Sequence, residues 1–184
     1  IVGGAFLAGG MSYNSLFLIA AAIGVLALLL FIFLVPESRR AGLAKPALPN
    51  LRILKDRELL MLCIACLFSM LFYTQFYTLL PIFGREVLLL DELQIAWFFS
   101  VSGMTVVALQ FPTSYFVRNV PKRSGYILGV VLMAAGITGI ALAQDFNTLL
   151  GMVILMTLGE NLFFPLAQAM VAEIAPEAER GMYM

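Results

Sequence analysis

The residue with the clearest chemical potential is Glu160, the one ionisable residue in a long apolar stretch, residues 148–172. A charged side chain at the centre of a membrane-spanning helix costs roughly 2.5–3.5 kcal/mol, so such a residue usually faces a cavity or a partner. Loss of surrounding water favours the neutral acid of a carboxyl group. Two interpretations follow. Glu160 handles a proton or a substrate, or it is a hydrogen-bonded group that fastens its helix to a neighbour.

Two amides and a proline accompany this carboxyl group. Asn161 and Gln168 are seven positions apart and share one face of a helix, whereas Glu160 projects roughly 100° away from Asn161. The three side chains therefore need not contact one ligand. Pro165 has no N–H to donate to the carbonyl of Asn161, and a kink there is one way to form a gate. Proline kinks without any gating role are equally common.

A second polar group lies in the apolar stretch 59–83, where Ser69, Tyr73 and Tyr77 follow one another at four-residue spacing and Gln75 lies beside them. Tyr73, Gln75 and Tyr77 favour a face that lines a cavity for amphipathic molecules. The alternative is hydrogen bonding between helices, worth about 0.6 kcal/mol on average in membrane proteins.

The other polar residues give little support for chemistry. Ser102, Thr105 and Gln110 are expected to serve packing and backbone hydrogen bonding. Cys63 and Cys66 have the C-x-x-C spacing, but in an apolar helix they are expected to act as small apolar fillers. The chain has no His, which excludes a Ser-His-Asp triad and a His-based metal centre, and it has no phosphate-binding Gly-rich loop. We expect no metal, no cofactor and no enzymatic activity.

The elements that must position these residues are five apolar stretches of near-membrane length. Roughly 20 helical residues cross a hydrocarbon core of about 30 Å, in which the backbone must satisfy its own hydrogen bonds. The composition agrees, because 62% of residues are hydrophobic and only 12% are charged, against about 25% in soluble domains. The sequence predicts an all-α, polytopic transmembrane bundle in a lipid bilayer. Its helices are expected at residues 16–35, 59–83, 93–117, 125–143 and 148–172.

The positive charges predict the orientation of these helices. Of 11 Lys and Arg residues, all but Arg85 lie in three segments, residues 36–58, 118–124 and 173–181. The positive-inside rule places these segments in the cytoplasm of a multi-pass protein of the cell membrane. The net charge is zero, so no basic field invites nucleic acid.

Small residues recur at four-residue spacing in the fourth stretch, at positions 125 and 129 and at positions 135, 139 and 143. This spacing permits close contact between helices in lipid. We expect this helix to pack tightly against a neighbour.

Three local patterns together resemble the major facilitator superfamily of secondary transporters. Residues 113–123, with Arg118, Lys122 and Arg123, resemble the basic signature loop of each family repeat, although Val117 stands where the family often has Asp and the usual glycines are absent. Residues 159–165 (Gly-Glu-Asn-Leu-Phe-Phe-Pro) and the loop after them resemble the family's tenth helix. Residues 1–4 (Ile-Val-Gly-Gly) are similar to the tail of the fifth-helix motif of antiporters.

The resemblance implies an internal fragment of a fold with two six-helix halves, from the end of helix 5 to the start of helix 11. Residues 1–35 would end the N-terminal half, residues 36–58 would be the central cytoplasmic linker, and residues 59–184 would belong to the C-terminal half. The implied function is secondary active transport of a small molecule by alternating access. We favour proton-coupled efflux of lipophilic compounds, as in multidrug antiporters. The alternatives are uptake of a sugar or metabolite, and a membrane scaffold or channel-like bundle that transports nothing. The substrate, the direction of transport and the oligomeric state are left open.

Overall fold

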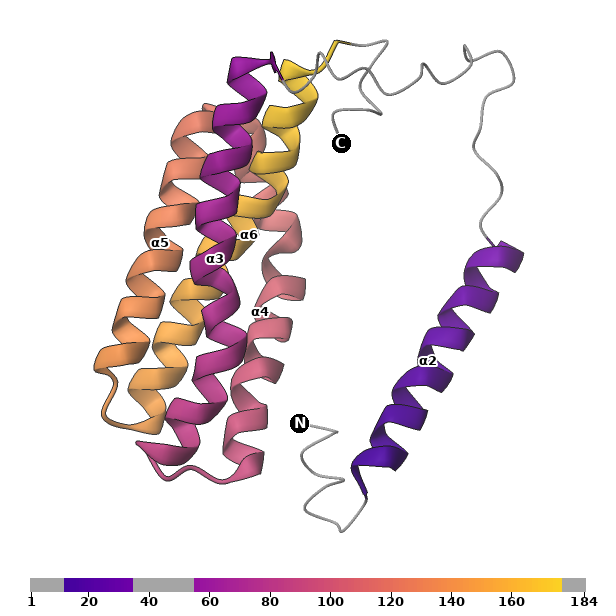
Figure 1. Cartoon of the computed structure of the whole chain (residues 1–184), viewed down its shortest axis with the longest axis vertical. Helices are drawn as coiled ribbons and strands as arrows, with labels where there is room; N and C mark the ends of the chain where they lie inside the picture. The colour runs from indigo at the N-terminus through magenta and orange to yellow at the C-terminus, as the bar shows by residue number, and fades with distance from the viewer. Residues whose placement is uncertain (1–11, 35–54, 177–184) are drawn as a thin grey trace. The chain divides into compact units, whose positions relative to one another are not determined.

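A computed structural model of the chain describes residues 12–34 and 55–176, and every regular element in those ranges is an α-helix (Figure 1). The chain divides into two compact units, residues 1–48 and 49–184, and each is described by itself. The first contains α2. The second contains α3, α4, α5 and α6. The helix bounds are Tyr13–Leu34, Arg57–Glu86, Glu92–Asn119, Lys122–Leu142 and Phe146–Ile174.

All five helices are long and apolar enough to cross a membrane. Each contains one of the stretches predicted from the sequence, except that α2 ends at Leu34 and α5 at Leu142, one residue early in each case. The prediction of an all-helical membrane bundle is confirmed. Most helices also extend past the predicted ends because charged residues such as Arg57, Arg118 and Lys122 continue the helix instead of forming the loop. Long basic side chains at helix ends can reach the aqueous interface without breaking the helix.

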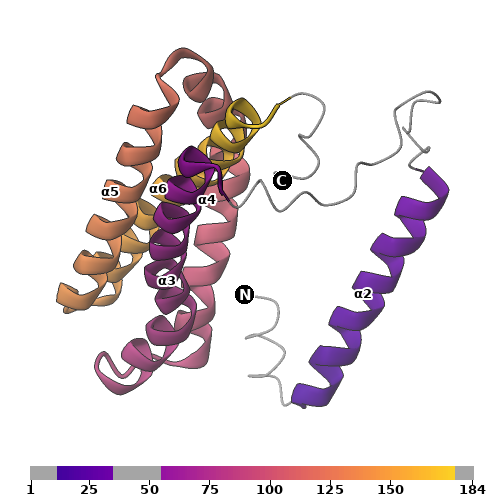
Figure 2. The ribbon, with the colours of Figure 1, turned by 45° about the horizontal axis from the view of Figure 1, so that its top comes forward.

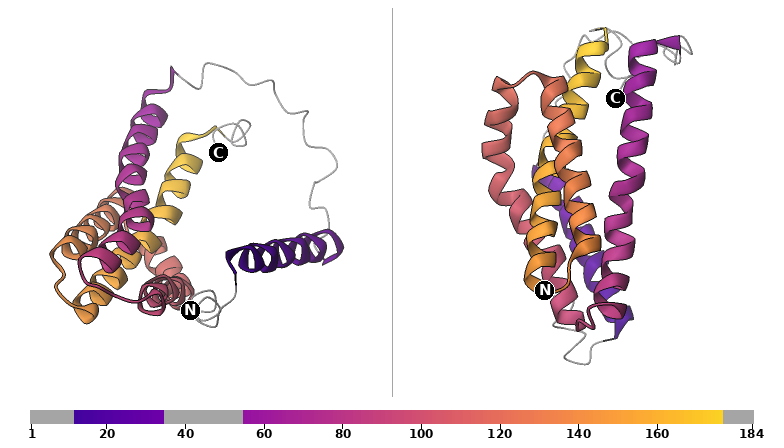
Figure 3. Two further views of the ribbon diagram at one scale, coloured as in Figure 1. Left: turned by 60° about the horizontal axis from the view of Figure 1, so that its bottom comes forward. Right: turned by 90° about the vertical axis from the view of Figure 1, so that its left-hand side faces the viewer.

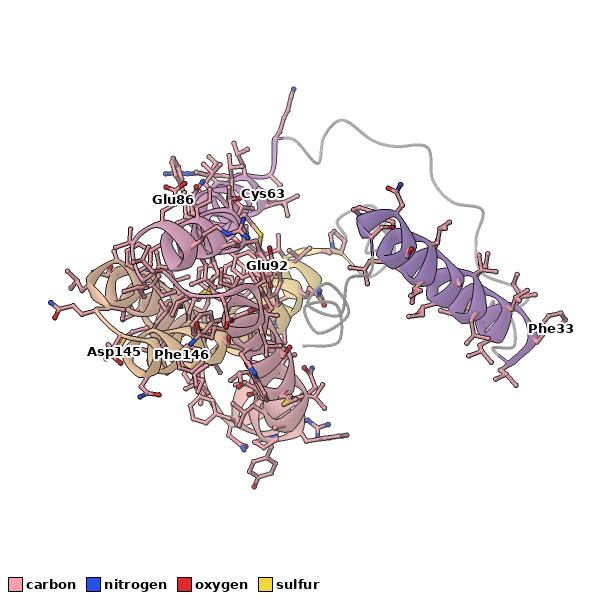
Figure 4. All side chains as sticks on the ribbon, turned by 90° about the horizontal axis from the view of Figure 1, so that it is seen from below. Phe33, Cys63, Glu86, Glu92, Asp145 and Phe146 are labelled. Atoms are coloured by element: carbon pink, nitrogen blue, oxygen red, sulfur yellow. The ribbon has the colours of Figure 1, made fainter. Side chains whose placement is uncertain are left out.

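The helix α2 has no Asp, Glu, Lys or Arg over its 22 residues, and none of its most apolar window is buried within the structure. Its aliphatic and aromatic side chains project on all sides, as at Phe33 (Figure 4), which is 79% exposed. A helix that is apolar all round fits a lipid environment. Of the predicted linker, residues 36–58, positions 36–54 lie outside the described residues.

Three of the four bundle helices begin at an aspartate that caps exposed backbone N–H groups. Asp56 accepts from the N–H groups of Glu58 and Leu59, and Asp91 forms a reciprocal capping box with Gln94. Such caps are worth about 1 kcal/mol each and favour sharp helix starts.

The third cap lies at the start of α6. Asp145 accepts from the backbone N–H of Thr148 at 2.9 Å and from its hydroxyl at 2.6 Å. These hydrogen bonds lower the pKa of the exposed Asp145 carboxyl group, and the bond from the Thr148 hydroxyl has the larger effect. α5 differs, because it follows Pro121 and has no side-chain cap.

The four helices of the second unit run antiparallel to their chain neighbours, as their short connections require (Figure 1). α6 packs against each of α3, α4 and α5, and Figures 1 and 2 show it between α5 and α4. The most fully buried side chains include Phe98 of α4, Met133 of α5 and Phe163 of α6. The central position of α6 buries the polar residues near its middle, such as Thr157 and Asn161, against the other helices.

The contact between α5 and α6, seen along its length in Figure 3, is the closest in the bundle. A Cβ atom added at Gly159 of α6 would lie 2.5 Å from the carbonyl oxygen of Gly129 and from the backbone nitrogen of Met133. A Cβ atom at Gly136 would lie 2.6 Å from the backbone nitrogen of Met156. The predicted small-residue face is therefore present, with Gly136 in place of the exposed Ala135.

The two ends of the bundle differ in charge. One end carries the start of α3, the turn between α4 and α5, and the end of α6, with Arg57, Arg118, Lys122 and Arg123. Figure 4 looks onto the opposite end, where Glu86, Glu92 and Asp145 lie. Arg85 is the one basic residue near that end among the described residues, and it pairs with Glu92 at 2.6 Å.

Candidate functional site

The candidate site is centred on Glu160, which stands at the middle of α6 (Phe146–Ile174). Its Oε1 atom accepts a hydrogen bond of 2.8 Å from the hydroxyl of Tyr73, which lies near the middle of α3. These two residues are 87 positions apart in the chain, and no local pattern could have paired them. The structure thus joins the two polar groups that the sequence singled out on separate helices.

A chain of hydroxyl groups leads away from the carboxyl group. The Tyr73 hydroxyl also lies 2.9 Å from the Tyr77 hydroxyl. Tyr73 has one hydroxyl proton, which it donates to Glu160, so Tyr77 is the donor in this second bond. Tyr77 is 48% exposed, and its ring stacks on Phe99 of α4 with centroids 5.9 Å apart. The path from Glu160 therefore reaches the surface of the bundle through two phenols.

A cavity of about 230 Å³ lies on the other side of Glu160, between α4 and α6. Glu160 is the only ionisable residue among the described residues that line it. Polar and apolar groups share its wall, which is formed by Val106, Gln110, Glu160, Asn161, Phe164, Pro165 and Gln168.

Four residues predicted as site residues therefore line one cavity, Glu160, Asn161, Pro165 and Gln168. Glu160 and Asn161 project roughly 100° apart around α6, yet both side chains line this one cavity. Gln110 of α4 completes the polar wall, although the sequence assigned it to packing. Its only signal was an amide two residues before the helical Pro112.

Two polar atoms in the site have no partner among the described residues. Both Glu160 Oε2 and Asn161 Nδ2 are buried without a hydrogen bond. Asn161 as a whole is 7% exposed. Leaving a buried donor or acceptor unpaired costs about 1–3 kcal/mol, and more for a charged group. Such atoms are rare in folded proteins and mark places where a ligand, an ion or water completes the hydrogen bonding.

Gln75 is the predicted cavity residue that the structure does not bring to this site. Its amide nitrogen lies 3.4 Å from the backbone oxygen of Leu71 on its own helix. It lines a separate, mostly apolar cavity of about 150 Å³ with Phe76 of α3 and Ile137 of α5. The role of Gln75 as a substrate residue stays a prediction that this geometry does not support.

Pro165 lies inside α6, which continues without interruption to Ile174. It lines the cavity beside Asn161, one turn away. Whether the helix bends there during a functional cycle stays a prediction. The position is suitable, because a proline removes one backbone hydrogen bond next to the candidate site.

The remaining polar residues fasten helices together. The Ser102 and Thr157 hydroxyls share a buried hydrogen bond of 2.9 Å between α4 and α6, which agrees with the packing role expected for Ser102. Ser69 lies 3.4 Å from the buried Tyr126 hydroxyl, which also approaches Cys66. No cluster of metal-ligating side chains occurs within residues 12–34 and 55–176.

The basic signature residues lie at one end of the bundle, away from Glu160. Arg118 is in the last turn of α4, and Lys122 and Arg123 begin α5, so only Val120 and Pro121 remain as the connection. The ammonium group of Lys122 pairs with Glu173 of α6. Arg123 lines a larger cavity of about 790 Å³ between α3, α5 and α6 whose wall is mostly apolar. None of the predicted substrate residues lies there.

The arrangement can accept a proton or a cationic group at Glu160 and can pass hydrogen bonds through Tyr73 to Tyr77. The described residues hold no cluster of metal-ligating side chains, and the chain has no His for a His-based acid–base pair. The chemistry that these residues could perform is binding and proton exchange at the middle of a membrane-spanning bundle. Intramembrane ionisable residues with these surroundings are typical of substrate and proton pathways.

Comparison with known proteins gives a consistent result. A family model described as Major Facilitator Superfamily matches residues 1–184. Among curated proteins, the MFS-type transporter clz9 of Cochliobolus lunatus is 36% identical over 72 residues, which are 39% of this chain and 8% of that protein. The matched region is thus a small part of that relative's length. No solved structure matches the chain.

Proposed function

This chain belongs to the major facilitator superfamily, and from that premise we propose that it is part of a secondary active transporter that moves a small molecule by alternating access. Within that class we propose proton-coupled efflux of lipophilic compounds. The observation that carries the proposal is Glu160 at the centre of α6, which lines a cavity and has one carboxyl oxygen held by Tyr73 and the other buried without a hydrogen bond.

Proton coupling needs a carboxyl group that can exist in two protonation states within the membrane. Glu160 meets this need, because Tyr73 donates to one oxygen while the second oxygen lies unpaired at the cavity. The hydroxyl of Tyr77 extends the hydrogen-bonded path toward the surface of the bundle. We propose that protons reach Glu160 by this path and that Pro165 lets α6 bend as the cavity opens and closes.

The same proposal assigns the membrane topology and the domains. The basic segments 36–58, 118–124 and 173–181 face the cytoplasm. Residues 36–58 join the two halves of the transporter, with residues 1–35 in the N-terminal half and 59–184 in the C-terminal half.

One observation favours a second candidate function, the uptake of a polar metabolite. Gln110, Asn161 and Gln168 place three amides around the cavity, and amides suit the hydroxyl groups of a sugar. The aromatic side chains of Tyr77 and Phe99 next to the site favour a lipophilic substrate instead. The direction of flux under an imposed proton gradient separates the two candidates.

The test uses the full-length protein in liposomes with a lipophilic fluorescent dye and a pH gradient of either sign. We expect dye flux that depends on the gradient and stops when a protonophore collapses it. In the Glu160→Gln variant the gradient-driven rate of dye flux should fall by about tenfold or more, because an amide cannot take up and release a proton as a carboxyl group does. Glu86→Gln, at the exposed end of α3, is the matched control and should behave as the wild type.

Each alternative has its own outcome. Wild-type flux with unchanged pH dependence in Glu160→Gln would remove Glu160 from the mechanism. Absence of any gradient-dependent flux in the wild-type protein would favour the membrane scaffold.

A further inference from the structure

Two of the residues that line the cavity beside Glu160 hold a buried polar atom without a hydrogen bond, one an acceptor and one a donor. The acceptor is Glu160 Oε2 and the donor is Asn161 Nδ2, and neither atom has a partner among the described residues. Asn161 is 7% exposed, so little water can reach its amide. Both residues line the same cavity of about 230 Å³.

The charge of the ligand follows from what surrounds the carboxyl group. α3 contributes the phenols Tyr73 and Tyr77, and α4 contributes Val106 and Gln110. No Lys or Arg lines this cavity within the part of the chain that the structure describes. In a low-dielectric site a lone carboxylate repels an anion and attracts a cation strongly. The cavity therefore selects against anionic ligands.

The apolar wall suits a positive head group as well. The ring of Phe164 lines the cavity and is oriented edge-to-face with Tyr73, with centroids 5.6 Å apart. Aromatic faces attract Lys-like and other organic cations within about 6 Å of the ring centre. A volume of about 230 Å³ is below the roughly 300–1,000 Å³ of pockets that enclose drug-sized ligands, so the cavity fits a head group.

We propose that this cavity binds the head group of an organic cation that carries an N–H donor and, beside it, a hydrogen-bond acceptor. The N–H group donates to Glu160 Oε2, and the acceptor receives the amide N–H of Asn161. This inference rests on the proposed transport function, because it names the substrate class of the same site. It goes beyond that function by excluding anionic compounds and neutral ones.

The first experiment compares four compounds that share an indole ring on the purified full-length protein. L-Tryptophanamide is a cation with a neighbouring carbonyl, tryptamine is a cation without one, N-acetyl-tryptophanamide is neutral, and N-acetyl-tryptophan is an anion. We expect L-tryptophanamide to bind most tightly and tryptamine about fivefold more weakly. Both acetylated compounds should bind more than about tenfold more weakly than L-tryptophanamide. Each lacks the ammonium group, and losing its charge-assisted hydrogen bond to Glu160 weakens binding by about this factor. Equal binding of the cation and the neutral compound would overturn the inference, as would binding of none of the four.

The second experiment assigns the two preferences to two residues. Glu160→Gln should abolish the preference of the site for tryptamine over neutral N-acetyl-tryptophanamide. Asn161→Ala should abolish the preference for L-tryptophanamide over tryptamine and leave the charge preference intact. Asn119→Ala, at the end of α4, is the matched amide control. An Asn161→Ala protein that keeps the full preference for the carbonyl would contradict the assigned donor.

These outcomes separate the inference from the proposed function. A wild-type protein that binds the cations in the expected order but shows no gradient-driven flux contradicts the proposed function alone. A protein that transports neutral dyes without any preference for the cations contradicts this inference alone. Because the wild-type ranking is measured without substitutions, a variant that fails to fold does not remove the test.

Discussion

At the scale of single residues, Glu160 is held in place by one phenol while its other oxygen stays available. Tyr73 donates at 2.8 Å to Oε1 and accepts from Tyr77, whose ring is half exposed. The two tyrosines therefore contribute unequally. The Tyr73 hydroxyl donates to the carboxyl group of Glu160 on another helix, whereas the Tyr77 hydroxyl bonds only to Tyr73 on its own helix.

This inequality gives a prediction for stability. Tyr73→Phe should lower the free energy of unfolding of the full-length protein by about 1 kcal/mol, because it leaves Glu160 without any partner. Tyr77→Phe should lower it by less than about half of that, since its hydroxyl lies near the bundle surface. Equilibrium unfolding in mixed micelles measures both values, and equal losses in the two variants would contradict the inequality.

At the scale of elements, α5 and α6 are in backbone contact. Gly159 has the carbonyl oxygen of Gly129 and the nitrogen of Met133 where a Cβ atom would lie, each 2.5 Å away. Backbone atoms in two packed helices cannot give way as the end of a flexible side chain can. The glycines are therefore required by close approach of the helices.

We expect Gly159→Ala to destabilise the protein by about 1–3 kcal/mol, the usual cost of overpacking a core. Gly151→Ala is the control on the same helix, because nothing lies within 4 Å of a Cβ atom added there. That substitution should be neutral or stabilising by up to about 1 kcal/mol, since alanine favours the helix over glycine. Thermal unfolding of both variants in the same detergent decides the matter, and a harmless Gly159→Ala would show that the helices are further apart.

The elements also show how far the sequence could predict the structure. Apolar length was sufficient to locate each helix to within about three residues, because the bilayer sets that length directly. The loops were predicted too long, since charged residues such as Arg85 and Lys122 extend the helices toward the interface. The contact of Tyr73 with Glu160 could not be predicted, because it depends on how two distant helices are rotated against each other. For the same reason the sequence predicted Gln75 as a site residue and Gln110 as a packing residue, whereas the structure places Gln110 at the cavity beside Glu160 and Gln75 at another cavity.

At the scale of the whole molecule, the described basic residues of the bundle gather at one end, with Arg85 as the exception. The start of α3, the turn before α5 and the end of α6 meet there, opposite the end that carries Glu86 and Glu92. Because the connections are short and consecutive helices are antiparallel, these three segments must lie at the same end of the bundle. The positive-inside rule then predicts which end is cytoplasmic.

Cysteine labelling of the full-length protein in intact cells tests this orientation. Replacing every cysteine of that protein with alanine, Cys63 and Cys66 included, gives a background for single replacements, Leu89→Cys in the turn after α3 and Arg123→Cys at the start of α5. We expect a membrane-impermeant maleimide to label Leu89→Cys from outside and to reach Arg123→Cys only after the cells are opened. A permeant maleimide should label both and serves as the control. Labelling of both positions from one face would contradict the proposed topology.

The backbone contact at Gly129 and Gly159 has a mechanical consequence. Packed helices slide past each other by small rearrangements of the side-chain layer between them. Where the backbones touch, as at Gly129 and Gly159, that layer is missing, so α5 and α6 have little freedom to slide past each other there. Sliding within the bundle is then left to the contacts of α6 with α3 and α4, where side chains separate the helices. Tyr73 and Glu160 lie at the contact with α3, so the proposed proton site is placed where the helices can still move relative to each other.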